Sequence, residues 1–111
     1  MNKHQAILKY ILPMIEVHPV EDEANWARAI TYKDQRNIFK HASIYLSLDA
    51  QSLPEILKNF ILYHEYAHII NNILNPNIPD SHGPEYQEIL GNLLPTYRIF
   101  QEMLKHHMTE Y

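Results

Sequence analysis

Two histidines and a glutamate in the middle of the chain have the spacing of a catalytic metal site. Three residues separate His64 from His68, and Glu65 follows His64 directly. On a helix, side chains four positions apart lie on one face, so both imidazoles can bind the same ion. Zinc lowers the pKa of a bound water to about 7, and a nearby carboxylate can take its proton as the water attacks a carbonyl carbon. The pattern therefore predicts zinc-dependent hydrolysis with Glu65 as general base.

The residues around this motif predict a long buried helix over residues 52–74. Ser52 and Glu55 have the spacing of a capping box, and the pattern ends at Asn75 because a proline follows it. The helix is hydrophobic on almost every side, which is typical of a buried helix. Burying two imidazoles and a carboxylate without partners would be unfavourable by several kcal/mol, whereas a metal ion and its water satisfy all three. The alternative is that the histidines are hydrogen-bonded core residues and Glu65 lies at the surface.

A catalytic zinc needs a third protein ligand, and the spacing leaves three candidates. One known pattern places glycine at position 71 and histidine at position 74, but this chain has Asn71 and Leu74 there, so that pattern is excluded. His82 is the next histidine, and Glu85 and Glu88 follow it in a predicted helix. Spacing alone does not choose among these three residues, and His82 could instead cap that helix.

The remaining patterns predict an α+β domain around this helix. Three further helices are predicted. Residues 3–12 have hydrophobic side chains at helical spacing, residues 84–94 begin with a proline that the first turn of a helix tolerates, and residues 96–107 follow Pro95. Residues 26–32 and 42–48 alternate in the manner of half-buried strands. The predicted loops and turns are residues 17–25, 33–41 and 75–81.

Length and composition limit the domain count and the class of partner. With 111 residues, we expect one domain spanning residues 1–111. The net charge of −4 and the scattered Lys and Arg argue against a nucleic-acid partner. Cysteine is absent, so metal ligands must be His, Asp or Glu. The N-terminus has no signal-peptide pattern, and the most hydrophobic run, residues 60–74, is too short and polar to span a bilayer. We therefore expect a soluble, cytoplasmic protein with no membrane partner.

Several segments together resemble the minigluzincins, the shortest metallopeptidases. The matching segments are residues 46–48, 53–55, 60–68, 82–86 and 95–98. The chain is also similar to the SprT-like group and to the catalytic domains of HtpX-type membrane metallopeptidases, over residues 26–104. This resemblance implies a small, mostly antiparallel sheet packed on the long helix, with further helices on both sides in sequence. Some SprT-like proteins are DNA-linked proteases, which the acidic net charge disfavours here.

The resemblance also implies roles for individual residues. It makes His82 the third zinc ligand, in place of either glutamate. It implies a peptide or protein substrate bound in extended form along an edge strand, here residues 42–48. Tyr97 and Arg98 match the Pro-x-aromatic-Arg segment of SprT-like relatives, so they are candidates for stabilising the oxyanion, as is Tyr86.

Members of the family are proenzymes silenced by their C-terminal segments, which predicts a latency tail here at about residues 105–111. This tail carries His106, His107, Glu110 and the carboxylate of Tyr111, all suited to contact a metal or a cleft. The tail could act within one monomer or in a tail-swapped dimer, or it could be a solvated terminus. Two other functional classes are a zinc-binding recognition module without catalysis and a metal-free helical interaction domain.

Overall fold

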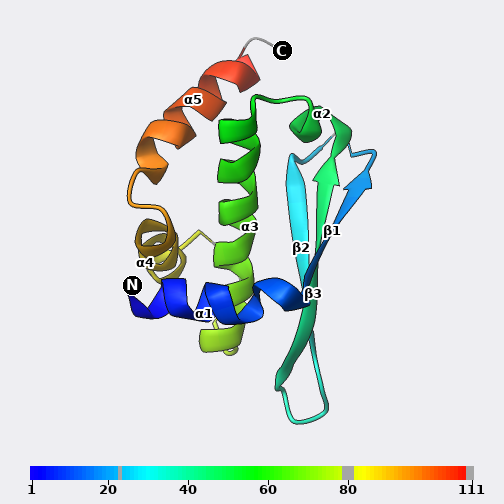
Figure 1. The fold of residues 1–111 in the computed structure, drawn as a ribbon, viewed down its shortest axis with the longest axis vertical. Helices are drawn as coiled ribbons and strands as arrows, with labels where there is room; N and C mark the ends of the chain where they lie inside the picture. Colours follow the sequence, from blue (N-terminus) through cyan, green and yellow to red (C-terminus); the bar gives the residue numbers. More distant parts are fainter. Residues whose placement is uncertain (23, 79–81, 110–111) are drawn as a thin grey trace.

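The structure, a computed structural model, describes residues 1–22, 24–78 and 82–109, without the side chains of residues 104 and 107–109. Helices pack on one face of a three-stranded sheet (Figure 1), so the predicted α+β class is confirmed. The elements in chain order are α1 (Lys3–Ile11), the 3-10 helix η1 (Leu12–Met14), β1 (Ile15–Val20), β2 (Ala27–Lys33), β3 (Phe39–Ser47), α2 (Leu48–Gln51), α3 (Glu55–Leu74), α4 (Pro84–Leu93) and α5 (Tyr97–Thr109).

The sheet has the strand order β1-β3-β2 and is mixed. β2 and β3 form the predicted antiparallel pair, joined by a hairpin in which Asn37 has a φ of 65°. β1 pairs with β3 in parallel, from Ile15 opposite Ala42 to Val20 opposite Ser47. The prediction that residues 17–25 form a loop was therefore wrong for its first four residues. Pro19 suggested a loop, but an edge strand such as β1 tolerates proline.

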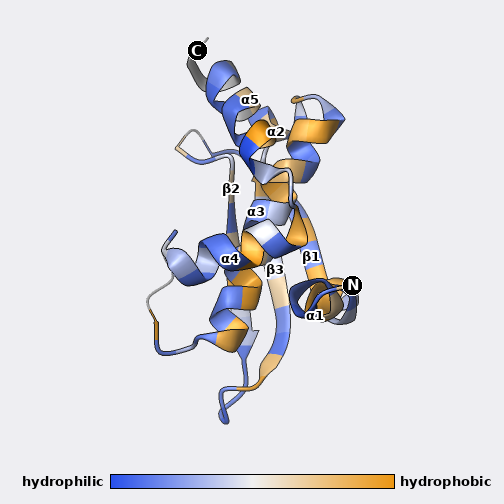
Figure 2. Cartoon of the chain, turned by 90° about the vertical axis from the view of Figure 1, so that its left-hand side faces the viewer, coloured by the Kyte–Doolittle hydropathy of each residue, from blue (hydrophilic) through white to orange (hydrophobic). Residues whose placement is uncertain are grey.

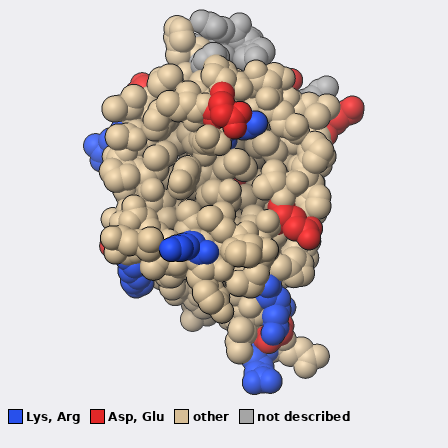
Figure 3. All heavy atoms as spheres, viewed as in Figure 1, with Lys and Arg blue, Asp and Glu red and all other residues tan. Residues whose placement is uncertain are grey.

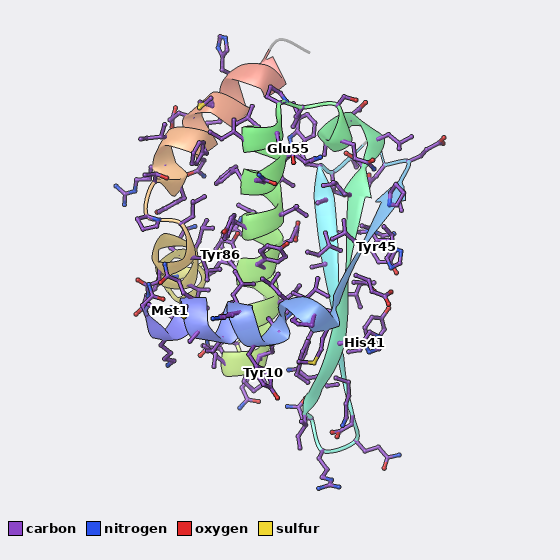
Figure 4. All side chains as sticks on the ribbon, in the orientation of Figure 1. Met1, Tyr10, His41, Tyr45, Glu55 and Tyr86 are labelled. Atoms are coloured by element: carbon purple, nitrogen blue, oxygen red, sulfur yellow. The ribbon has the colours of Figure 1, made fainter. Side chains whose placement is uncertain are left out.

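β3 is the central strand, because it pairs with β1 on one side and with β2 on the other. Its residues Ala42 and Ile44 are fully buried. The assignment of residues 42–48 as a peptide-binding edge strand was therefore wrong, and the two edges of the sheet belong to β1 and β2. The face of the sheet turned away from α3 carries aromatic side chains, among them His41 and Tyr45 (Figure 4).

The central helix begins at Glu55, later than the capping box predicted. Ser52 does not cap α3. It ends the short, unpredicted helix α2 instead, and its hydroxyl donates to the carbonyl of Leu48 at 3.0 Å. The cause is Pro54, because the residue before a proline is kept out of the helical region. Pro54 itself is extended, with a ψ of 144°, and α3 starts directly after it. The other three predicted helices are present, with ends within two residues of those expected.

Two clusters of buried side chains hold α3 in place. Figure 2 shows hydrophobic stretches alternating with hydrophilic ones along the helices. The larger cluster joins α3 to the sheet, to α1 and to α4, and it includes Ala67, Ile69 and Ile70, all fully buried. The smaller cluster lies beneath α2 and includes Leu57 and Ile61. Because core contacts lie both before and after residues 64–68, this stretch of helix has a fixed orientation.

None of the described helices combines the length and hydrophobicity that crossing a bilayer requires. Lys and Arg side chains are scattered over the face in Figure 3, and they gather only at the hairpin between β2 and β3. Even there an acidic group intervenes, since Asp34 forms an ion pair with Lys40 at 3.6 Å.

Candidate metal centre

Three histidines come together beside the middle of α3. His64 and His68 lie one helical turn apart, and His82 comes from the segment that leads into α4. Ring nitrogens of the three residues all lie within 4.8 Å of one another. The Nε2 atoms of His68 and His82 are 3.1 Å apart and share a hydrogen bond. The structure thus brings together the three residues predicted as ligands.

This arrangement fits a divalent metal ion. Nitrogens about 2.0–2.1 Å from a tetrahedral zinc lie about 3.3 Å from each other, close to the distance between His68 and His82. Within the described ranges, no further His, Asp or Glu joins this group. Three histidines and an open fourth position are the donor set of catalytic zinc sites, whereas structural sites use four protein ligands.

The surroundings of His64 keep its imidazole neutral, which is the form that binds metals. Burial, together with repulsion of a positive charge by the neighbouring His68 and His82, lowers the pKa of His64 to about 4. His64 is therefore uncharged at neutral pH, with one ring nitrogen free of a proton.

Glu65 lies in the same cavity as the three histidines. The cavity has a volume of about 580 Å³ and is lined by Ala24, Asn25, Trp26, Ala27, Phe60, Ile61, His64, Glu65, His68, His82, Gln101 and Lys105. Glu65 is only 6% exposed. The alternative in which Glu65 is a surface residue therefore does not describe this fold. A buried carboxylate beside three imidazoles is suited to proton transfer in a site of this size.

No protein-family model matches the chain, and no curated protein sequence matches it. Among solved structures, the crystal structure of the metallopeptidase zymogen abylysin from Pyrococcus abyssi matches it with a TM-score of 0.63. The match covers 96% of this chain and 87% of that chain, at 21% sequence identity. This chain therefore shares the fold of that protein. At this identity the match establishes the fold, and the function has to be argued from the site.

In this fold the two glutamates considered as third ligands lie elsewhere. Glu85 and Glu88 line a second cavity of about 400 Å³, together with His4 and Asn92. That cavity lies between α1 and α4, where Nδ2 of Asn92 is 2.8 Å from Nδ1 of His4. Of the three candidates, the structure therefore brings only His82 to the histidines of α3.

Tyr97 and Arg98, the predicted oxyanion residues, do not line the cavity of the histidines. The Nε of Arg98 donates to the hydroxyl of Tyr97 at 3.4 Å, and the Tyr97 ring lies close to Gly91 of α4. α5 contributes Gln101 and Lys105 to the cavity instead. These lie one and two helical turns beyond Tyr97, and only the packing of α5 brings them to the cavity. A catalytic role for Tyr97 and Arg98 stays a prediction.

Tyr86, the third oxyanion candidate, lies beneath the histidines rather than facing the cavity. Its side chain is fully buried, and its hydroxyl donates to the backbone carbonyl of His64 at 3.0 Å. Sequence reasoning did not identify Trp26, which lines the cavity from the position just before β2. Its only sequence signal was its position as the first residue of a predicted strand.

Proposed function

We propose that this chain is a zinc-dependent metallopeptidase of the minigluzincin type that hydrolyses peptide bonds. One observation carries the proposal, namely that His64, His68, His82 and the buried Glu65 line one cavity. The fold of a metallopeptidase zymogen supports it. A non-catalytic zinc site would have no use for a buried carboxylate at this position, and it usually has four protein ligands.

His64, His68 and His82 would hold the zinc ion. Zinc supplies a Lewis acid that polarises the substrate carbonyl and acidifies a water molecule. Glu65 follows His64 on α3, so its carboxylate is within the cavity where the attack occurs. It accepts the proton of the attacking water and passes it to the nitrogen of the leaving amine. The low exposure of Glu65 limits exchange of that proton with bulk water.

The substrate would lie along β2, because Ala27 at its start and Ala24, Asn25 and Trp26 just before it form one wall of the cavity. The amide of Ser47 in β3 donates to the carbonyl of Trp26 at 2.9 Å. Since the backbone groups of an antiparallel strand point alternately to its two sides, those of Ala27 and Ala29 face away from β3. We propose that an extended peptide pairs with these groups, which replaces the earlier assignment to residues 42–48.

We also propose that α5 and the residues after it keep the peptidase latent. Gln101 and Lys105 reach the cavity from α5, and Phe60 of α3 lies 6.1 Å from Phe100, centroid to centroid. α5 therefore forms the wall opposite β2. Of the predicted tail, Glu110 and Tyr111 lie outside the described residues. The proposal includes both arrangements of the tail, within one monomer and in a tail-swapped dimer.

Latency is tested by truncation. Deleting the residues beyond Lys105 should raise the rate of peptide hydrolysis, and deleting all of α5 should raise it further. The matched control is the full-length chain with Lys105→Ala and Gln101→Ala, which keeps α5 but shortens its side chains in the cavity. An unchanged rate in both truncated chains, with zinc bound and the fold retained by circular dichroism, would refute the proposed latency.

The metal centre is tested by elemental analysis of protein purified without chelator. We expect about one zinc per chain in the wild type and much less in His82→Ala, while His41→Ala, a substitution on the outer face of the sheet, should change nothing. Glu65→Gln should keep the zinc and abolish hydrolysis. Absence of zinc in the wild type, even after incubation with a zinc salt, would sink the proposal. Zinc binding without hydrolysis in any truncated chain would favour a non-catalytic recognition module.

The absence of a nucleic-acid partner and a cytoplasmic location stay predictions.

A further inference from the structure

Tyr86 contacts all three histidines, and the proposed mechanism does not use it. Its ring centroid lies 4.4 Å from that of His68, 4.8 Å from that of His82 and 5.3 Å from that of His64. Tyr86 is 0% exposed, and Figure 4 shows it between α4 and α3. One buried side chain therefore supports the rings of every proposed ligand.

The hydroxyl of Tyr86 fixes the ring relative to α3. It donates to the backbone carbonyl of His64 at 3.0 Å. This bond connects α4 to the helical turn that carries His64 and Glu65, and it gives the buried hydroxyl a hydrogen-bond partner. A phenylalanine could fill the same space but could not make this connection.

His82 needs such support because it is not part of a helix. It is exposed and precedes α4, whereas His64 and His68 are held by the backbone of α3. Two hydrogen bonds link its segment to α4, one from the Gln87 amide to the Gly83 carbonyl and one from the Gln87 side chain to the His82 carbonyl. Tyr86 precedes Gln87 and adds a contact to the imidazole ring itself.

We propose that Tyr86 is a positioning residue of the metal centre, which holds His82 against the two histidines of α3 before a metal binds. This inference rests on the proposed metal centre. Side chains that are free to rotate lose conformational entropy when they bind a ligand, and packing them in advance removes part of that loss. Residues that orient metal ligands typically change metal affinity by about 10–100-fold when they are substituted.

The test uses the full-length chain, with Tyr86→Phe, Tyr86→Leu and the control Ile89→Ala. Ile89 is also a buried residue of α4, but it lines the second cavity, away from the histidines. Co²⁺ is titrated into metal-free protein, and its binding is followed by the d–d absorption of the ion. Zn²⁺ affinity is measured by competition with a chelator, and protein stability is measured by urea unfolding.

We expect Tyr86→Phe to weaken metal binding about 2–10-fold through loss of one hydrogen bond. Tyr86→Leu should weaken it about 10–100-fold and alter the Co²⁺ spectrum. Ile89→Ala should lower stability and leave both metal readouts unchanged.

Each of the following three outcomes would overturn the inference and show which part of it is wrong. Wild-type affinity and spectrum in both Tyr86 variants would refute the positioning role and leave the metal centre intact. An equal loss of affinity in Ile89→Ala would show that any destabilisation of α4 has this effect. Absence of Co²⁺ and Zn²⁺ binding in the wild type would remove the metal centre and the inference together. Tyr86→Phe keeps the ring in the core, so it provides the test if Tyr86→Leu does not fold.

Discussion

Acid should destabilise the metal-free protein through His64. Burial and the two neighbouring histidines lower the pKa of His64 from 6.5 to about 4 in the folded chain. The unfolded chain therefore binds this proton at a higher pH than the folded chain, so stability falls as the pH falls below about 6.5. The loss continues until the pH passes the folded pKa of about 4, below which both states carry the proton.

The size of the effect follows from the two pKa values. A pKa difference of about 2.5 units limits the total loss to about 3 kcal/mol, at 1.36 kcal/mol per unit. Between pH 7 and pH 5, the same two values give a loss of about 2 kcal/mol. With a urea dependence of about 2 kcal/mol per molar, the midpoint of unfolding should move by about 1 M.

The assay is urea unfolding of chelator-treated protein at a series of pH values between 7 and 5, for wild type, His64→Gln and the control His41→Gln. The loss of stability should be smaller by about 2 kcal/mol in His64→Gln than in the other two proteins. Groups away from His64 and its two neighbouring histidines titrate alike in wild type and His64→Gln. Asp34, for example, has its pKa lowered mainly by a hydrogen bond from the Ile38 amide. The same pH dependence in wild type and His64→Gln would refute the reasoning.

Substitutions at three further residues test the fold that positions the site. Ile70→Ala removes a fully buried side chain of α3 and should lower the free energy of unfolding by about 2–5 kcal/mol, measured by urea titration. Asn37→Val should lower it by about 1–2 kcal/mol because Asn37 has a φ of 65°, whereas Asn37→Gly should leave it nearly unchanged. Lys33→Met removes the bond from the Lys33 ammonium to the Asn72 carbonyl (2.6 Å) between β2 and α3, and should lower thermal stability by the equivalent of about 1–2 kcal/mol.

The parts of the fold that the sequence predicted are those with strong local signals. The presence of α3, its end before Pro76, the strand β2 and most of β3 follow from hydrophobic periodicity and proline positions, although β3 begins three residues earlier than predicted, at Phe39. β1 was missed because Pro19 suggested a loop, whereas an edge strand such as β1, paired in parallel with β3, tolerates proline. The start of α3 was misplaced because Ser52 satisfies a capping rule that Pro54 overrides.

The site was predictable in its local part only. His64 and His68 share one helix, so their spacing alone places them together. His82 is 14 residues from His68, and nothing in that interval determines whether it turns back toward α3. The packing of α4 against α3 decides this, and it also places Glu85 and Glu88 beside α1. Gln101 and Lys105 were missed for the same reason, because the placement of α5 depends on packing and not on spacing.

The small size of the domain couples its stability to the metal centre. α3 presents His64, Glu65 and His68 to the cavity, while Ala67, Ile69 and Ile70 of the same two turns are fully buried. A metal that binds only the folded chain stabilises it by about 4 kcal/mol when its concentration is about 1,000 times the dissociation constant. That is a large part of the roughly 5–15 kcal/mol that holds a typical domain folded. Loss of one ligand would therefore lower both metal content and stability, whereas Glu65→Gln retains the ligands and should lower activity alone.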